Sequence, residues 1–198
     1  NSDKYNLSHN DAQHLLILNQ YTDEKRGISY IYVGQKLNEI PIYNVQTTFY
    51  ISRKGQIGTV ASGFINTDKF QVSGSRSAII SVEQAIKNAA LNVGVVNPKT
   101  QLKERKGDNP LFDAGNISQL PIEPQMTYFK TSDNELTLGY VLQIKKINSM
   151  DHYQIVVDGV TGKILNKVNY TLSCKFDGPD QYTNHSNCDS HDHINIIS

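Results

Sequence analysis

The residues best suited to bind a metal gather near the end of the chain. They are His185, Cys188, Asp189, His191, Asp192 and His193. Imidazole and thiolate groups are the usual protein ligands of transition metals. Their spacing matches no closed structural zinc site, however, and a polar segment enriched in histidine by chance is the alternative. Metal binding by Cys188, His191 and His193 therefore stands as one of two interpretations.

The two cysteines of the chain, Cys174 and Cys188, lie in the same segment, which is rich in Asn, Asp, Ser and His. Such a segment offers no apolar core that would shelter a free thiol. We therefore expect a disulfide between them, formed in an oxidising compartment. Closing a loop of this length would contribute about 3 kcal/mol of stability.

Catalytic motifs are absent from the sequence. A thermolysin-type zinc site needs the pattern HExxH, and the chain has no His-Glu pair. It has no GxSxG elbow either. The stretch Gly159 to Lys163, GVTGK, lacks the spacing of a phosphate-binding loop and predicts a hairpin turn. We expect no catalytic residue, no cofactor and no enzymatic activity in this chain by itself.

Composition limits the class of partner. The 198 residues carry 19 basic and 19 acidic side chains, and no basic stripe suited to nucleic acid stands out. The cluster Lys103 to Lys106 contains a Glu and runs into a Gly-Asp-Asn-Pro turn, which is typical of a solvated loop. No apolar run approaches the ~20 residues of a membrane span. The length allows one large or two small domains.

The first half of the chain predicts a helix, a meander and a second helix. Ser8 and Asp11 suit a helix start, and the face from Ala12 to Asn19 suggests a short helix. Alternation then predicts strands over 28–33, 43–51 and 57–64, with a glycine turn at 55. Ser81 and Gln84 form a capping box for a helix that ends at Gly94. We expect this helix to cover the meander and the first domain to span 1–96.

The second half predicts a small antiparallel sheet. Residues 97–124, with four prolines, two glycines and the basic cluster, suggest a linker. Four strand-like runs follow, over 126–130, 136–147, 153–157 and 163–170, and they define a domain at 125–170. Residues 171–198 then form an irregular polar tail. The fold class predicted is α+β, with two small lobes that each pack a sheet against helix.

Two stretches of this sequence resemble one protein family. In the first, Tyr32, Gln35, Asn38, Ile40, Tyr43, Gly55, Ser62 and Phe64 follow the order seen in the fungalysin/thermolysin propeptide (FTP) domain of secreted zinc metallopeptidases. In the second, Tyr153, Val157, Asp158, Thr161, Gly162 and Ile164 resemble its PepSY-like end. The likeness covers about residues 8–170 and is nearest to the fungalysin-type branch, peptidase family M36. It implies cystatin-like and PepSY-like lobes.

The resemblance also implies a function. Such a propeptide belongs to a secreted, extracellular precursor, chaperones its catalytic domain and inhibits it, and the catalytic domain carries the zinc. We expect that domain to be the partner, with processing at or near Ser198. A thiolate of Cys174 or Cys188, or His191 or His193, could alternatively reach the partner's zinc as a latch. The alternative function is a free-standing secreted module that inhibits proteases or binds ligand.

Overall fold

The structure, a computed structural model, describes residues 5, 7–74, 79–106 and 109–171. Its elements are η2 (Asp11–Gln13), β1 (Leu15–Asp23), β2 (Ile28–Leu37), β3 (Ile40–Ile51), β4 (Ile57–Ser62), η3 (Thr67–Lys69), β5 (Gln71–Ser73), α1 (Val82–Asn92), β6 (Leu102–Lys106), β7 (Asn109–Phe112), β8 (Gln125–Ser132), β9 (Glu135–Lys145), β10 (His152–Asp158) and β11 (Ile164–Asn169). None of the described helices is long and apolar enough to cross a bilayer.

Nine of the strands form one mixed sheet. Its main path runs β1-β2-β3-β8-β9-β10-β11, with β4 paired to β3 and β5 paired to β9. Strands β6 and β7 form a separate hairpin. The predicted α+β fold of two lobes, each packed with helix, is therefore wrong. The described part of the chain is mostly β, and its single α-helix covers one part of a continuous sheet.

The predicted meander is present and gains one strand. β2, β3 and β4 pair antiparallel in sequence order, as the alternating pattern indicates. β1 adds to the free side of β2 along its full length, from Leu15 opposite Gln35 to Asp23 opposite Ile28. The helix predicted over this stretch is wrong, because only the short turn η2 is helical. Four consecutive apolar residues at 15–18 cannot share one helix face, whereas in the strand the first three pair with β2 and Leu18 lies at a bulge.

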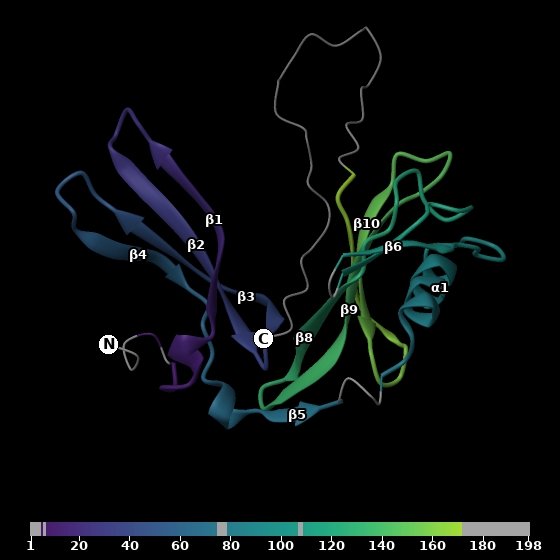
Figure 1. Ribbon diagram of the computed structural model, residues 1–198, viewed down its shortest axis with the longest axis horizontal. Coiled ribbons are helices and arrows are strands. Elements are labelled where there is room, and N and C mark those ends of the chain that lie inside the picture. Colours follow the sequence, from purple (N-terminus) through teal and green to yellow (C-terminus); the bar gives the residue numbers. More distant parts are fainter. Residues whose placement is uncertain (1–4, 6, 75–78, 107–108, 172–198) are drawn as a thin grey trace, which may run out of the picture.

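Two arms meet at the centre of the sheet (Figure 1). One arm contains β1 to β4 and the other β8 to β11, and the parallel pair Ile42 with Tyr128 joins them. The Thr127 hydroxyl strengthens this junction by donating to the Pro41 carbonyl at 2.8 Å. One pair of residues is a short seam, so packing must hold the arms together.

Packing across the seam comes from a core that both arms share. This shared core contains Leu7, Val33, Ile40, Ile42, Val45 and Phe64 from the first arm and Tyr128, Leu136 and Leu138 from the second. Leu136 and Leu138 are fully buried. Each arm therefore covers apolar surface of the other, and separating them would expose it to water.

Helix α1 packs on the second arm and not on the meander. Ile86 and Ala89 are fully buried against Leu142, Ile155 and Val157, in a second core. Ser81 caps the helix by accepting from the Gln84 N–H, and Gly94 follows its end with a φ of 82°. The predicted helix and its cap are confirmed. The expectation that it covers the meander is wrong, because its alanine-rich stripe fits closely against β9 and β10 (Figure 1).

Residues 97–124, expected as a linker, carry structure and core residues. They contain the hairpin of β6 and β7, and β7 ends at Phe112, which is fully buried. Ile117 and Ile122 are buried in the same core as α1. Phe112 and Ile122 also exchange backbone hydrogen bonds of 2.8 and 3.0 Å. The prolines and glycines of this stretch thus shape turns that return the chain to the core.

Candidate functional site

The predicted ligand, disulfide and processing residues lie outside the described part of the chain. They are Cys174, Cys188, His191, His193 and Ser198. The disulfide, the metal site and the processing position therefore stay predictions. Within the residues that the structure describes, no group of three His, Cys, Asp or Glu side chains is placed to hold a metal ion.

A buried polar cluster fastens the start of the chain to the first arm. The Asp11 carboxylate accepts from the Ser8 N–H at 2.9 Å and the Thr67 N–H at 3.1 Å, and also from the Thr67 hydroxyl. The Gln35 amide donates to it at 3.0 Å. Gln35 also exchanges two hydrogen bonds with the Ile65 backbone. All of these buried polar groups have hydrogen-bond partners, which is typical of a cluster that stabilises the fold.

Burial and hydrogen bonding act in opposite directions on Asp11. Loss of water around the carboxylate would raise its pKa, but hydrogen bonds from Thr67 and Ser8 outweigh that effect. The pKa of Asp11 is therefore lowered below its ordinary value of 3.8. The group stays ionised at neutral pH and is unsuited to act as a proton donor there.

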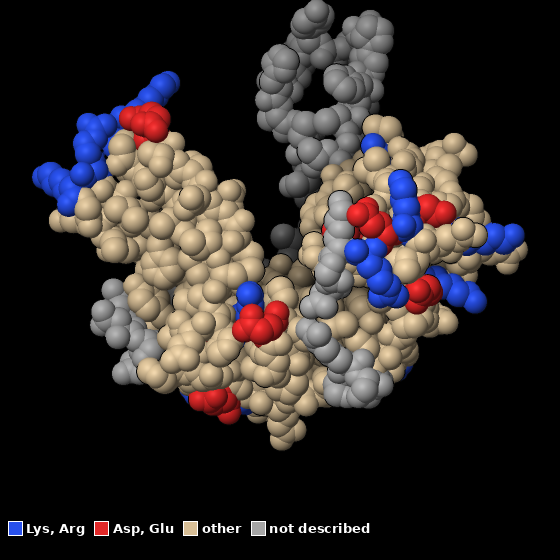
Figure 2. All heavy atoms as spheres, in the orientation of Figure 1, with Lys and Arg blue, Asp and Glu red and all other residues tan. Residues whose placement is uncertain are grey.

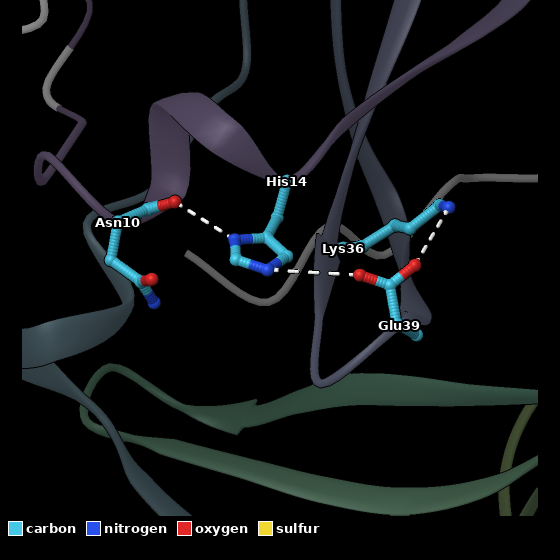
Figure 3. A network of polar contacts seen from close by, with 4 residues as sticks. All are labelled: Asn10, His14, Lys36 and Glu39. Carbon is cyan, nitrogen blue, oxygen red and sulfur yellow. Dashed lines mark hydrogen bonds and ion pairs between the residues drawn. The ribbon is translucent and has the colours of Figure 1, made fainter.

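A second polar network joins η2 to the β2–β3 turn (Figure 3). His14 Nδ1 lies 2.9 Å from the Asn10 carbonyl, so this nitrogen must carry a proton and donate it. His14 Nε2 lies 3.6 Å from Glu39, and Lys36 Nζ lies 3.3 Å from the other oxygen of the same carboxylate. No nucleophile adjoins the histidine among these contacts. The network lies at the exposed end of the hairpin, and these contacts include no catalytic pair.

Aromatic hydroxyls link the two arms near their junction. Tyr43 of β3 donates to Gln154 Oε1 of β10 at 2.8 Å, and Tyr170 donates to the same oxygen at 2.8 Å. The Tyr43 ring also contacts Phe129, with centroids 5.3 Å apart. Burial and then the nearby Tyr170 raise the pKa of Tyr43, which keeps its hydroxyl protonated as a donor. These contacts tie the arms together.

The turn between β10 and β11 contains the second set of family-like residues. The Asp158 carboxylate accepts from the Val160 and Thr161 N–H groups, at 2.7 and 3.0 Å. Gly162 has a φ of 71°, which favours glycine. The predicted hairpin turn over Gly159 to Lys163 is confirmed, and the backbone N–H groups that a phosphate would need are already bonded within it.

An open hollow of about 700 Å³ lies between α1 and the segment 98–117. Lys87, Lys99, Asp113 and Asn116 are among its lining residues. Asn116 Oδ1 accepts from the Lys99 N–H at 2.7 Å, and Asp113 accepts from Thr100 at 2.9 Å. Asn116 and Asp113 thus hold the loop in shape, and Lys87 and Lys99 are exposed.

Cationic side chains project from the tip of the first arm (Figure 2). The turns after β1 and β3 lie at the same end because Ser29 pairs with Ile51. They carry Lys25, Arg26, Arg53 and Lys54. Asp23 pairs with Arg26 at 3.7 Å, and Glu24 adds a second negative charge. The tip is therefore polar and only modestly positive.

The outer edge of β1 is the least expected surface. Ile17 is 65% exposed, and Leu18 and Tyr21 are each 49% exposed. The Tyr21 ring stacks on Tyr30 with centroids 5.0 Å apart, and a hydrogen bond with the Tyr32 hydroxyl raises the pKa of Tyr21. Because the sequence pattern predicted a helix over these residues, it did not predict an exposed strand edge. The signal that could have predicted the strand is the unbroken apolar run at 15–18, with Tyr and Thr at 21 and 22.

Comparisons with known proteins show similarity to solved structures but not to a family or a curated protein. No protein-family model matches this chain, and no curated protein matches it. Among solved structures, the chain is similar to the Bacillus megaterium YpeB C-terminal domain, at 16% sequence identity and a TM-score of 0.40. The match covers 79% of this chain and 57% of that chain, so it spans little more than half of the neighbour. A likeness at this level carries no argument about function.

Proposed function

We propose that this chain is the propeptide of a secreted zinc metalloendopeptidase, acting as intramolecular chaperone and inhibitor of a catalytic domain outside these residues. The proposal rests on the fungalysin-type pattern in the sequence. In it, the zinc belongs to the catalytic domain, as the family resemblance implies. The partner would be covalently fused before processing at or near Ser198, and extracellular afterwards.

The observation that carries the proposal is that residues of this pattern stabilise the fold through buried contacts and hydrogen bonds. Gln35 is fully buried and bonds both the Ile65 backbone and Asp11. Phe64 is buried in the shared core, and Asp158 with Gly162 closes the β10–β11 turn. Residues from both halves of the pattern thus occupy positions in one fold where their particular side chains, or the lack of one in glycine, are required. This supports an ordered pattern over a chance likeness.

Physical reasons favour a folded module of this kind as a chaperone and inhibitor. A peptidase that folds over a high barrier can use a preformed surface as a template. A sheet edge or an extended tail can then occupy the cleft as a non-productive substrate by adding a strand. In this proposal the Cys174–Cys188 disulfide stiffens the tail. A latch on the partner's zinc by a thiolate of Cys174 or Cys188 is the competing arrangement. His191 or His193 could act as a latch with the disulfide in place.

The reading frame after the Ser198 codon provides the first test. A following segment with HExxH supports the proposal, whereas a stop codon favours the free-standing inhibitory or ligand-binding module. The encoded catalytic domain would then be refolded with and without this chain. We expect faster recovery of activity with it, followed by inhibition that substrate relieves competitively. Unchanged refolding and unchanged activity at saturating chain would refute both roles.

A further inference from the structure

Strand β1 has an open edge, which is interrupted by a bulge between Ile17 and Asn19 but lacks the usual protection from Asn19 to Thr22. On the side away from β2, none of the described strands pairs with it. Natural edge strands are commonly blunted by lysine, proline or inward-pointing charge. β1 has none of these between Leu15 and Thr22, and its first charge is Asp23 at the end. Such an edge is suited to pairing with another strand.

The backbone direction shows which residues can pair outward. In a strand, the N–H and C=O of one residue point to the same side, and successive residues alternate. The Asp23 carbonyl accepts from the Gly27 N–H at 2.7 Å, toward β2, so Thr22 and Gln20 point outward. The hydrogen bond of the Gln20 N–H is consistent with an outward direction, because this group donates at 2.8 Å to the exposed Asn19 side chain and not to β2.

A stack of tyrosine rings ends at the same edge. Tyr21 lies 5.0 Å from Tyr30 and 6.2 Å from Tyr32 between ring centroids, with interplanar angles of 21° and 24°. The outer side of Tyr21 is left exposed. An aromatic ring from a neighbouring strand would continue the stack, and cross-strand aromatic pairs stabilise sheets.

We propose that β1 pairs antiparallel with β1 of a second copy of this chain, on a twofold axis at Tyr21. Gln20 then faces Thr22 of the second copy, and Thr22 faces its Gln20, so the outward groups exchange backbone hydrogen bonds. Tyr21 faces its own counterpart in the close, non-hydrogen-bonded position. Asn19 faces Asp23 of the second copy, an amide opposite a carboxylate. The strand is therefore complementary to itself in this register.

The proposed contact between the two β1 strands is small, so we expect the dimer to be weak. A few backbone hydrogen bonds and a pair of rings bury less than the roughly 1,000 Å² typical of stable interfaces. The second copy's Thr22 carbonyl also has to displace Asn19 from the Gln20 N–H. The dimer is thus weak and depends on concentration, and it forms whether or not the chain serves as a propeptide.

Sedimentation equilibrium of the full chain tests the pairing. The apparent mass should rise with concentration toward twice that of one chain. Thr22→Pro removes an outward N–H at an edge position that tolerates proline, and Tyr21→Lys opposes two like charges. Each should weaken the dimer about tenfold or more. Thr22→Val and Val60→Lys, the latter on exposed β4, should leave it unchanged, and circular dichroism checks that every variant folds.

Cross-linking tests the register separately. In a chain with Cys174→Ser and Cys188→Ser, Tyr21→Cys places two thiols in a non-hydrogen-bonded pair, a geometry that a disulfide can bridge. It should form covalent dimers under mild oxidation, whereas Gln20→Cys and Val60→Cys should not. A full chain that stays monomeric at all concentrations overturns the proposal. Equal cross-linking of the three cysteine variants overturns it as well.

Discussion

Asp11 holds its charge in the interior because four groups around its carboxylate donate hydrogen bonds to it. The Ser8, Thr67 and Gln35 donors all point at its two oxygens. Among the described residues, no buried side-chain nitrogen or oxygen lacks a hydrogen-bond partner. Exchanging one oxygen for an NH₂ group would set donor against donor in a place that water does not reach.

Asp11→Asn should therefore lower the free energy of unfolding by about 3 kcal/mol. Urea denaturation followed by circular dichroism measures the loss. Asp68→Asn is the matched control, since Asp68 is exposed on η3 and should change stability by less than about 0.5 kcal/mol. Equal effects of the two substitutions would contradict the role assigned to the buried cluster.

The stabilisation from Asp11 should also depend on pH. Its pKa is lower in the folded chain than the ordinary value of 3.8, so the unfolded chain binds its proton first as pH falls. The contribution is present in full above the unfolded pKa and is lost as pH falls through the folded pKa. The difference in stability between the wild-type chain and Asp11→Asn should accordingly shrink below about pH 4. A difference that stays constant down to pH 2 would reject this.

Glu39 occupies an unfavourable backbone conformation in the β2–β3 turn. Asn38 and Glu39 have φ values of 50° and 64°, the pattern of a two-residue turn in which Asn-Gly is preferred. Glu39 is 70% exposed, so its contacts with His14 and Lys36 contribute little. Glu39→Gly should raise the free energy of unfolding by about 0.5–1 kcal/mol.

Glu39→Gln separates the backbone from the charge in the same turn. It keeps the side chain and the strained φ but removes the carboxylate, and should change stability by at most about 0.5 kcal/mol. Thermal unfolding of both variants in parallel gives the comparison. A glycine variant less stable than the glutamine variant would mean that the ion pairs outweigh the backbone strain.

At the scale of elements, the cap of α1 offers a direct test of helix stability. Ser81 has an extended backbone and its hydroxyl accepts from the Gln84 N–H at 3.2 Å. Ser81→Ala should cost about 1 kcal/mol, and Ser81→Asp should restore the cap. Denaturation midpoints of the three chains decide the matter. Loss in both variants would show that the hydroxyl acts through some other contact.

Local patterns in the sequence account for many of these elements. Alternation marked β2, β3 and β4, and the capping box with Gly94 marked both ends of α1. The four runs of the second half correspond to β8, β9, β10 and β11. Each of these signals lies within about ten residues of chain, the range in which period and turn chemistry operate.

Contacts between distant segments could not be predicted in this way. Whether α1 covers the meander or β9 and β10 depends on the shape of both surfaces, and its apolar stripe is compatible with either. Phe112 and Ile122 lie in the core, but the prolines and glycines around them indicated a linker. Ser8 and Asp11 exchange hydrogen bonds, but the helix predicted from them is absent and only the short turn η2 follows. The bonds of Asp11 to Gln35 and Thr67 span 24 and 56 positions, beyond the reach of a local pattern.

At the scale of the whole molecule, the shared core makes the two arms one unit. Leu138 of β9 is fully buried there together with Ile42 and Val45 of β3. Thr127, Tyr43 and Gln154 add hydrogen bonds across the same junction. Separating the arms would therefore expose the buried apolar surface of both arms at once. This favours a single cooperative unfolding transition over two separate ones.

Leu138→Ala tests this unity because it removes apolar volume at the junction. It should cost about 2–5 kcal/mol of unfolding free energy. If the core is shared, hydrogen exchange should quicken in both arms, at the amides of Ile31 in β2 and Ile155 in β10 alike. Val60→Ala, on exposed β4, should leave both rates unchanged. Faster exchange at Ile155 alone would mean that the arms unfold as separate lobes.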